Sequence, residues 1–219
     1  MDKVSSTVEE YLETILRLEE KFGVAKTGVL AEVLKVALGT VTNTVEKLEK
    51  QGLVIHEPYK GIKLTEKGKK IALEVLRRHR LSERLLTDLL GVDWSKVHEV
   101  ACKLEHNLPN DILKNLEKVL GHPKTCPHGN PIPTSCGGIF EEPSEPLLNL
   151  KQGDVGIIVK ITEEEKEILD HLRKFKLIPG SLVKVLEKTS VDSLMKVKVE
   201  DVEAFLSFRL ASIINVKKV

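Results

Sequence analysis

The sequence predicts a mainly α-helical chain with some β structure, arranged as an N-terminal winged helix-turn-helix, a helical dimerisation domain and a C-terminal SH3-like β-barrel. Three observations lead to this fold class. Two short helical segments and a tight turn are followed by two β-rich runs around a Pro/Gly turn. Possible metal ligands recur at helical spacing between residues 79 and 106. From residue 150 the pattern changes to short alternating β runs. We expect domains at 1–73, 74–140 and 150–219, with a linker at 141–149.

Composition limits the classes of function. The 219 residues carry a formal charge of only +1, so local basic patches must support any nucleic-acid partner. Charged residues interrupt every hydrophobic run, and no stretch resembles a signal peptide or a membrane span. We therefore expect a cytoplasmic protein with no membrane association. The 3 cysteines make metal or thiol chemistry a better expectation than a disulfide framework.

The first predicted helix, residues 6–21, is amphipathic. Ser6 and Glu9 have the spacing of a capping box. Glu10 and Glu13 lie in or next to its first turn, where acidic side chains compensate the helix dipole. The alternative is that Glu10 or Glu13 reaches a metal ion.

A helix-turn-helix is predicted over residues 27–51, with a tight turn at 36–39. Apolar residues of the second helix point inward, and small polar residues lie near its start. A plain αα-hairpin is the alternative, but the runs LVIHE, PYKG and IKLT that follow are typical of a wing. Lysines at 60, 63, 67, 69 and 70 form a basic patch there. The candidate DNA contacts are Ala37, Gly39, Thr40, Thr42, Asn43, Lys47, Lys60 and Lys63.

Metal-ligand residue types recur in the segments RRHRLSERLL and SKVHEVACKLEHNL. In both segments they are three or four residues apart, so their side chains leave one helix face. Imidazole, thiolate and carboxylate together suit Fe(II), Mn(II), Co(II), Ni(II) or Zn(II) better than Ca or Mg. A solvated helix face explains any one of them more easily than the whole set. The six candidates, predicted to form two adjacent sites, are His79, Glu83, His98, Cys102, Glu105 and His106.

Apolar faces in the middle domain exceed what its helices would bury alone, which predicts a dimer interface. They comprise Leu85, Leu86, Leu89 and Leu90, and Ile112, Leu113, Leu116 and Leu120. Residues 121–149 are dense in Pro, Gly and Ser and predict an ordered loop followed by a linker. Cys126, His128, Cys136 and His122 could form another metal cluster or a redox pair there, although their spacing matches no strong zinc pattern.

The C-terminal β runs are DVGIIVKI, SLVKVLEK, LMKVKVE and SIINVKKV, and their turn spacing predicts the small barrel. A helical insert, EEEKEILDHLRKFKL, lies between the first two runs. Its acidic residues could lend a ligand to the middle domain, but a solvated helix face is the simpler interpretation.

Several runs resemble the metal-dependent repressors related to the diphtheria toxin repressor and the iron-dependent regulators. They are YLETI, GTVTNTVEKLEKQGLV, LTEKGKKIA, RRHRLSERLLTDLLGVDWSKVHEVACKLEH and HGNPIP. The resemblance covers nearly the whole chain, and RHRLSERLLTD and HEVACKLEH are its most specific parts. It implies a homodimer whose winged helices enter the major groove of double-stranded DNA when divalent metal is bound. It also implies a C-terminal domain of FeoA type.

Site residues follow from the same resemblance. It implies one metal site of His79, Glu83 and His98, and a second of Glu10, Cys102, Glu105 and His106, with Glu13 as a further candidate. The barrel of such proteins can lend a Glu and a Gln. The best match for the Glu is Glu165, while Ile168, at the Gln position, is unsuitable.

The resemblance leaves the metal divided between two types. Iron-type proteins usually have methionine where this chain has Glu10, whereas manganese-type proteins have acids at Glu10 and Glu13 but Glu in place of Cys102. A thiolate suits Fe(II) better than Mn(II). The sequence therefore predicts Fe(II), with Mn(II) as the alternative.

The predicted function is a metal-activated repressor of metal-homeostasis genes that binds a pseudo-palindromic operator as a dimer. The alternative within the family is a manganese-responsive regulator. A metal-buffering protein and a metal-blind winged-helix regulator are rivals. An enzyme whose metal centre activates water is a further rival, but the sequence has no HExxH motif or nucleophile–base pair, so we expect no enzyme.

Overall fold

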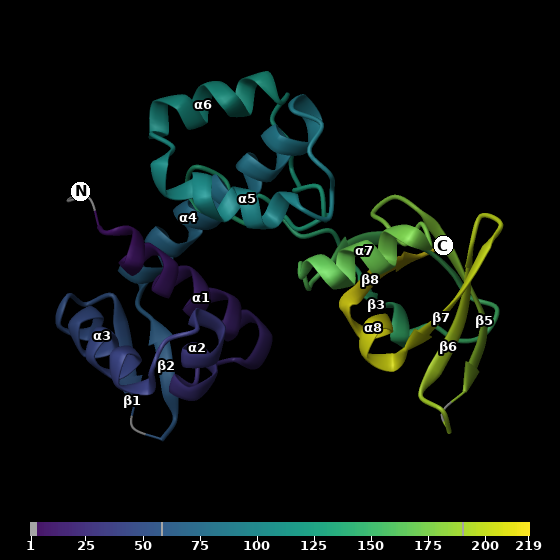
Figure 1. Cartoon of the computed structure of the whole chain (residues 1–219), viewed down its shortest axis with the longest axis horizontal. Coiled ribbons are helices and arrows are strands. Elements are labelled where there is room, and N and C mark those ends of the chain that lie inside the picture. The colour runs from purple at the N-terminus through teal and green to yellow at the C-terminus, as the bar shows by residue number, and fades with distance from the viewer. Residues whose placement is uncertain (1–3, 58, 190) are drawn as a thin grey trace. The chain divides into compact units, whose positions relative to one another are not determined.

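The structure, a computed structural model, describes residues 4–57, 59–189 and 191–219. The chain separates into two compact units (Figure 1). The first contains the residues up to Arg78 together with Pro133–Gly138, and the second contains His79–Ile132 and Ile139–Val219.

The first unit begins with helix α1 (Ser6–Phe22). The Ser5 hydroxyl accepts a hydrogen bond from the Val8 amide at 3.4 Å, so Ser5 caps this helix and the predicted cap at Ser6 is wrong. The helix ends at Gly23, whose φ of 77° is a left-handed conformation that glycine adopts without strain.

Helices α2 (Thr27–Leu34) and α3 (Leu38–Lys50) form the predicted helix-turn-helix. Their axes bend by 110° at the turn, within the usual range for this motif. Val41, Val45 and Leu48 of α3 are buried in the core that α1 and α2 share. The opposite face of α3 is therefore left on the surface.

The wing consists of β1 (Val54–Glu57) and β2 (Gly61–Leu64), which pair antiparallel. Pro58, in the predicted wing turn, lies outside the described residues. Thr65 then caps helix α4 (Glu66–Arg84), because its hydroxyl accepts a hydrogen bond from the Gly68 amide at 3.1 Å. Gly68 allows this helix to pass close to the wing, since a Cβ there would lie 2.0 Å from the Leu53 carbonyl oxygen. The winged helix predicted from the sequence is confirmed.

The helical part of the second unit continues from the end of α4. It contains a π-helix, η1 (Leu85–Leu89), then α5 (Val97–Leu104), a 3-10 turn η2 (Glu105–Asn107) and α6 (Asn110–Val119). The apolar residues predicted for a dimer interface divide between two environments. Leu86, Leu113 and Leu116 are buried, whereas Leu89, Leu90 and Ile112 are 52%, 63% and 48% exposed.

The C-terminal part is a six-stranded antiparallel sheet in the order β3-β8-β4-β5-β6-β7. Helices α7 and α8 and the 3-10 turn η3 accompany it (Figure 1). The segments are β3 (Glu145–Pro146), η3 (Leu147–Asn149), β4 (Val155–Ile161), α7 (Lys166–Lys174), β5 (Leu182–Thr189), β6 (Leu194–Val199), β7 (Val202–Ser207), α8 (Phe208–Ile213) and β8 (Ile214–Lys218).

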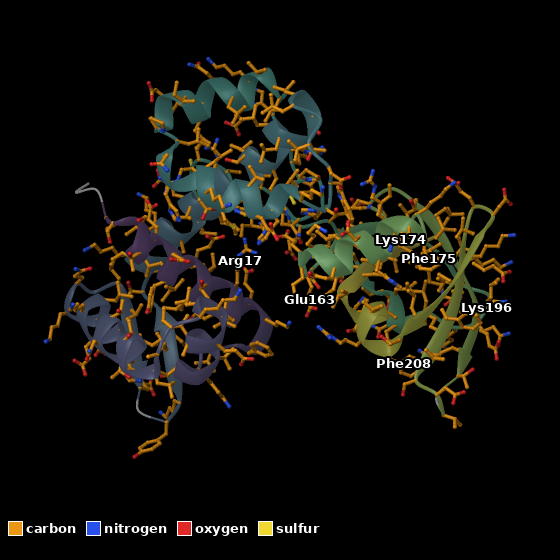
Figure 2. All side chains as sticks on the ribbon, viewed as in Figure 1. Arg17, Glu163, Lys174, Phe175, Lys196 and Phe208 are labelled. Carbon is orange, nitrogen blue, oxygen red and sulfur yellow. The ribbon has the colours of Figure 1, made fainter. Side chains whose placement is uncertain are left out.

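A closed barrel was expected here, and that detail is wrong. Among the described residues β3 pairs only with β8, and β7 pairs only with β6, so the sheet remains open. β3 has only two residues, which is too short a strand to close the sheet on the far edge. Two lysines of the C-terminal part lie over aromatic rings: Lys196 over the exposed Phe205 at 5.6 Å, and Lys188 over the half-buried Phe208 at 5.8 Å. Figure 2 labels Lys196 and Phe208.

No single helix among the described residues is both long and apolar enough to cross a membrane. The bent pair of α2 and α3 passes that test together, by length and composition only.

Candidate metal centre

The centre begins with two residues one turn apart near the end of α4. His79 and Glu83 are 1% and 0% exposed, and His79 Nε2 lies 3.2 Å from Glu83 Oε1. His98 of α5 faces both, with its Nδ1 3.1 Å from His79 Nε2 and 3.5 Å from Glu83 Oε1. The structure thus brings together the three residues predicted for the first site.

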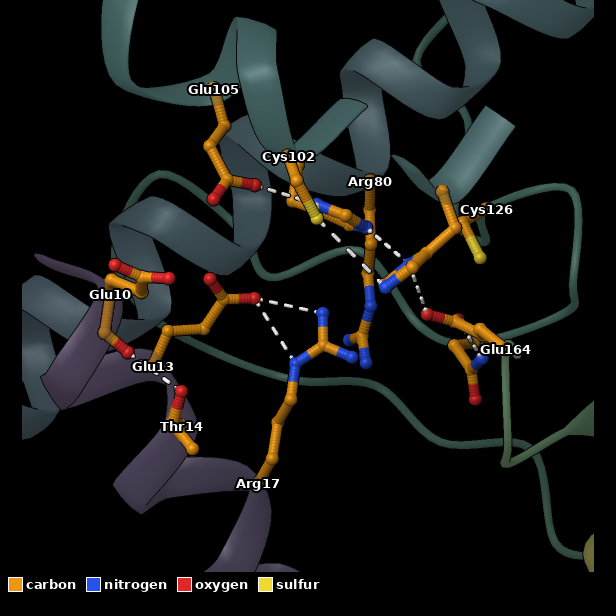
Figure 3. A network of polar contacts seen from close by, with 12 residues as sticks. Glu10, Glu13, Thr14, Arg17, Arg80, Cys102, Glu105, Cys126 and Glu164 are labelled. Atoms are coloured by element: carbon orange, nitrogen blue, oxygen red, sulfur yellow. Dashed lines mark hydrogen bonds and ion pairs between the residues drawn. The ribbon is translucent and has the colours of Figure 1, made fainter. Parts of the chain in front are cut away.

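A fourth group comes from the loop between β4 and α7. Glu164 Oε2 lies 3.0 Å from His98 Nδ1, and the Glu164 side chain is 6% exposed (Figure 3). Glu165, the carboxylate predicted from the family resemblance, is exposed at the N-cap of α7, and its neighbour Glu164 is the acid that faces His98. Asn130 fixes the loop, because its side-chain amide donates to Glu164 Oε1 at 2.7 Å and to the Ile161 carbonyl at 2.9 Å.

The same two carboxylates also face a second pair of ligands. His128 Nδ1 lies 3.4 Å from Glu83 Oε1 and 3.6 Å from Glu164 Oε1, and Cys126 Sγ lies 4.0 Å from that nitrogen. Cys126 and His128 are 1% and 0% exposed. The spacing of this Cys-x-His pair fits no zinc pattern, so the sequence indicates it only weakly. The available signal is that the run HGNPIP begins with His128 and that Cys126 lies two residues before it.

A tight turn presents these two side chains. The Cys126 amide donates to the Asn130 carbonyl at 2.8 Å, and the Gly129 amide donates to the Cys126 carbonyl at 2.9 Å. Gly129 has a φ of 85°, and a Cβ there would lie 2.0 Å from the Val159 carbonyl oxygen. The other two residues considered with this pair, Cys136 and His122, are exposed, and neither belongs to a group of potential metal ligands among the described residues.

Residues predicted for the second site surround the other edge of His79. Glu105 Oε2 accepts a hydrogen bond from His79 Nδ1 at 2.6 Å, and His106 Nε2 lies 3.3 Å from Glu105 Oε1. Cys102 is exposed, with its Sγ 3.9 Å from both His79 Nδ1 and His98 Nε2. The 3-10 turn η2 displaces Glu105 and His106 from the regular spacing of α5. Among the described residues, no group of three or more potential ligand residues whose ligand atoms all lie within 4.8 Å of one another includes His106.

The two acids predicted in α1 belong to the first unit. Glu10 is exposed, and Glu13 accepts hydrogen bonds from Arg17 Nε at 3.1 Å and Nη2 at 2.8 Å. That they supply ligands stays a prediction.

Opposite charges stabilise one another in the metal-free cluster. Burial opposes protonation of His98, but its contacts with Cys102 and Glu164 outweigh burial and raise its pKa to about 11. Burial also opposes the charge of Glu83, yet the neighbouring imidazoles hold its pKa well below the usual range. The pKa of the Cys102 thiol falls to about 7 despite burial, because His79 and His98 stabilise the thiolate. Burial raises the pKa of the Cys126 thiol.

The donor set fits a divalent transition metal. Metal–ligand bonds of about 2.0–2.2 Å to nitrogen and oxygen place neighbouring ligand atoms roughly 3 to 3.6 Å apart, as found around Glu83 and Glu164. Glu83 Oε2 is buried and has no hydrogen-bond partner among the described residues. A buried carboxylate oxygen without a partner is unfavourable, and a bound cation would satisfy it.

The predicted DNA contacts lie on the surface of the first unit. Six of them, on or just before the first half of α3, are exposed: Ala37, Gly39, Thr40, Thr42, Asn43 and Lys47. On the wing, Lys63 is exposed, and exposed Lys60 pairs with Glu57 at 2.7 Å.

A winged helix-turn-helix and a cluster of potential transition-metal ligands in one chain are the features of a metal-responsive DNA-binding regulator. The family model described as "Iron dependent repressor, N-terminal DNA binding domain" matches residues 3–62, and "Iron dependent repressor, metal binding and dimerisation domain" matches residues 65–134. A third, "FeoA domain", matches residues 145–218. The chain belongs to the iron-dependent repressor family.

Relatives of known description agree with this assignment. The iron-dependent repressor IdeR of Mycobacterium tuberculosis is 36% identical over 197 residues, which cover 84% of this chain and 86% of the relative. The diphtheria toxin repressor of Corynebacterium diphtheriae is 41% identical over 133 residues, 61% of this chain and 59% of the relative.

Two solved structures match almost the whole chain. A manganese-dependent transcriptional repressor in complex with manganese has a TM-score of 0.88 at 29% identity, covering 97% of this chain and 100% of the other. IdeR of T. acidophilum has a TM-score of 0.82 at 27% identity, with both chains covered completely (100%).

Proposed function

We propose that this chain is a divalent-metal-activated transcriptional repressor that binds DNA as a homodimer and controls genes of metal-ion homeostasis. The observation that carries the proposal is the buried donor set His79, Glu83, His98 and Glu164, in a chain whose helix α3 exposes its polar face. A bound ion would neutralise the two carboxylates and fix the imidazoles. Such a change biases a two-state arrangement of a regulator.

The DNA target follows from the dimer. Two copies present two α3 helices related by a two-fold axis, so the operator is pseudo-palindromic with half-sites one or more helical turns apart. Asn43 is suited to pair with an adenine edge, and Lys63 to contact phosphate.

Iron(II) is the proposed activator. The two cysteine sulfurs near the cluster, those of Cys102 and Cys126, favour it over Mn(II), and the relatives named above include iron-dependent repressors. Manganese(II) is the second candidate, supported by the carboxylates Glu83 and Glu164 and by the manganese-dependent repressor of similar structure.

We further propose at least two metal sites per chain. One uses the buried donor set, and the other uses Cys102, Glu105 and His106 with Glu10 or Glu13 of α1. The variant Glu10→Gln tests whether Glu10 is a ligand of the second site. It should abolish metal-activated DNA binding while leaving occupancy of the buried set unchanged in calorimetry. If Glu10→Gln changed neither DNA binding nor metal binding, Glu10 would not be a ligand of this site.

The test of function is a gel-shift series with promoter DNA and a panel of divalent metals, under anaerobic conditions. We expect retarded complexes with Fe(II) or Mn(II) and none with chelator or with Mg(II). His98→Ala should shift the curve to higher metal concentration, and His122→Ala, a matched exposed imidazole, should not. Metal binding without any effect on DNA would indicate a buffering protein, and DNA binding without metal would indicate a metal-blind regulator.

A further inference from the structure

We propose that the buried cluster holds two metal ions side by side, bridged by the carboxylates of Glu83 and Glu164. His79 and His98 complete the shell of one ion, and Cys126 and His128 complete that of the other. The inference rests on the proposed function, since it concerns the same metal centre. The proposed function requires one ion in the buried donor set. The further inference adds a second ion beside it, bound by Cys126 and His128.

Glu164 supplies the first observation, because its two oxygens face different partners. Oε2 lies 3.0 Å from His98 Nδ1, whereas Oε1 lies 3.6 Å from His128 Nδ1. Asn130 donates to Oε1 and so fixes the rotation of the carboxylate. A carboxylate in this orientation can give one oxygen to each of two neighbouring ions. Two-metal sites in proteins have ions about 3.5–4 Å apart, a spacing that a carboxylate spans.

Glu83 supplies the second observation. Its Oε1 faces imidazoles of both sets, at 3.2 Å from His79 Nε2 and 3.4 Å from His128 Nδ1. Its Oε2 is buried and has no hydrogen-bond partner among the described residues. One ion bound to Oε1 would leave that second oxygen unsatisfied. A second ion would use it.

The imidazoles are oriented for separate ions. The Glu105 carboxylate accepts from His79 Nδ1 at 2.6 Å, which leaves Nε2 to face the cluster. The Trp94 carbonyl accepts from His128 Nε2 at 3.0 Å, which leaves Nδ1 to face it. Hydrogen bonds of this kind fix the tautomer of a metal-bound histidine. His79 and His128 therefore each present one nitrogen to the carboxylate of Glu83.

The acidic groups of the cluster can balance two ions as well as one. Glu83, Glu164 and a Cys126 thiolate formed on metal binding would carry three negative charges. One divalent ion then leaves one net negative charge and two divalent ions leave one net positive charge, so the charge of the ligands is compatible with a second ion. The two shells also differ in softness, since only one contains sulfur, so the sulfur shell should prefer the softer ion of a mixed pair.

Electron paramagnetic resonance of the full-length protein loaded with Mn(II) tests the bridge directly. We expect an exchange-coupled spectrum from two ions per cluster. His128→Ala should remove the exchange-coupled signal and leave only signals of isolated ions, and native mass spectrometry should then record one ion fewer per chain. Glu164→Gln should also abolish the coupling. Cys136→Ser and His122→Ala are matched controls away from the cluster and should keep it.

Cobalt(II) provides an independent measurement. Loading should give a sulfur-to-cobalt charge-transfer band that Cys126→Ser reduces and that His98→Ala retains, since His98 belongs to the other ion. An isolated Mn(II) spectrum for the unsubstituted protein, with metal-dependent DNA binding intact, would overturn the bridge and leave the proposed function standing. Failure to bind metal at all would overturn both.

Discussion

Asn130 connects the two segments of the second unit that supply ligands to the cluster. Its side chain donates to Glu164 and to the Ile161 carbonyl, and its own carbonyl accepts from the Cys126 amide. Asn130→Ala should therefore release Glu164 and weaken metal binding by about 10–100-fold, the usual effect of losing an outer-sphere hydrogen bond. Calorimetry with Mn(II) measures this. The exposed Asn115→Ala is the matched control, and equal affinities for both variants would show that Asn130 does not position Glu164.

A second prediction concerns His98, where a proton and a metal ion compete for the same imidazole nitrogen. The pKa of His98 rises from 6.5 to about 11, so the metal-free imidazolium stabilises the fold through the neutral range and loses that contribution as pH rises toward 11. A metal ion must displace this proton. Metal affinity should therefore increase with pH, with protons released on binding. Calorimetry in two buffers of different ionisation enthalpy counts them, and His98→Ala should lower the count. An affinity that does not change between mildly acidic and neutral pH would contradict the prediction.

The residues that sequence could identify are those related by local spacing. His79 and Glu83 are four apart on one helix, so their proximity follows from helix geometry. Glu164 depends on where a loop ends and α7 begins, and a shift of one residue there selects a different side chain. Cys126 and His128 meet Glu83 only through tertiary packing, which no spacing rule records.

Among the elements, α3 and the wing should divide base recognition from phosphate binding. Asn43→Ala should weaken binding to the true operator by roughly 1–3 kcal/mol and reduce discrimination between operator variants. Lys63→Ala should weaken binding to all sequences alike. Gel-shift titrations of operator variants measure both effects, with exposed Lys118→Ala of α6 as the control. Unchanged affinity and preference in Asn43→Ala would mean that α3 is not the recognition helix.

The turn before α5 is joined to α7 by a polar network. The buried Ser95 hydroxyl lies 2.8 Å from Asp93 Oδ1 and 2.5 Å from Asp170 Oδ1, and Arg173 pairs with Asp93. The amide and hydroxyl of Ser95 and the Arg173 guanidinium lower the pKa of Asp93 to about 2. This network holds α7 near the helical part, and Glu164 directly precedes α7.

Removing the central hydroxyl should loosen this connection. Ser95→Ala removes the donor to Asp170 Oδ1, while Lys166 still donates to Oδ2, and it should lower the free energy of unfolding by about 0.5–1.5 kcal/mol. Metal affinity should fall as well, because Glu164 is less firmly placed. Urea denaturation followed by Trp94 fluorescence measures the stability, with exposed Ser212→Ala as the control. Equal denaturation midpoints for the two variants would show that the network contributes no stability.

Sequence patterns predicted the individual strands and helices better than they predicted whether the C-terminal sheet closes into a barrel. The alternating runs gave the strands of the C-terminal sheet, but pairing of its edges depends on β3, whose two residues carry no recognisable pattern. Likewise the 3-10 turn after α5 interrupts a periodicity that appears continuous in the sequence. The winged helix was predictable because each of its turns has a local cause, such as the Thr65 cap.

Over the whole molecule, positive and negative charges nearly cancel, but each sign is concentrated in a particular region. The formal charge is +1, yet exposed lysines at 60, 63, 67, 69 and 70 gather around the wing and the start of α4. Acidic groups instead gather at the buried cluster. DNA affinity should accordingly depend on salt through a small set of phosphate contacts.

The identity of the activating metal is also a property of the whole molecule, because affinity and DNA binding must be measured together. Zn, Ni and Co bind most protein sites more tightly than Fe(II) or Mn(II), so affinity alone does not name the activator. The sulfurs of Cys102 and Cys126 lie near the imidazoles, and Fe(II) gains more from a bound thiolate than Mn(II) does.

We therefore expect wild-type protein to bind DNA at lower free Fe(II) than free Mn(II). Cys102→Glu should shift activation toward Mn(II), because it replaces a soft ligand with a hard one beside His79 and His98. Gel shifts at matched free concentrations of the two ions under anaerobic conditions measure the shift. Cys136→Ser, an exposed cysteine outside the cluster, should behave as wild type. Activation of the wild type by Mn(II) at the lower concentration would reverse the assignment and make the chain a manganese-responsive repressor.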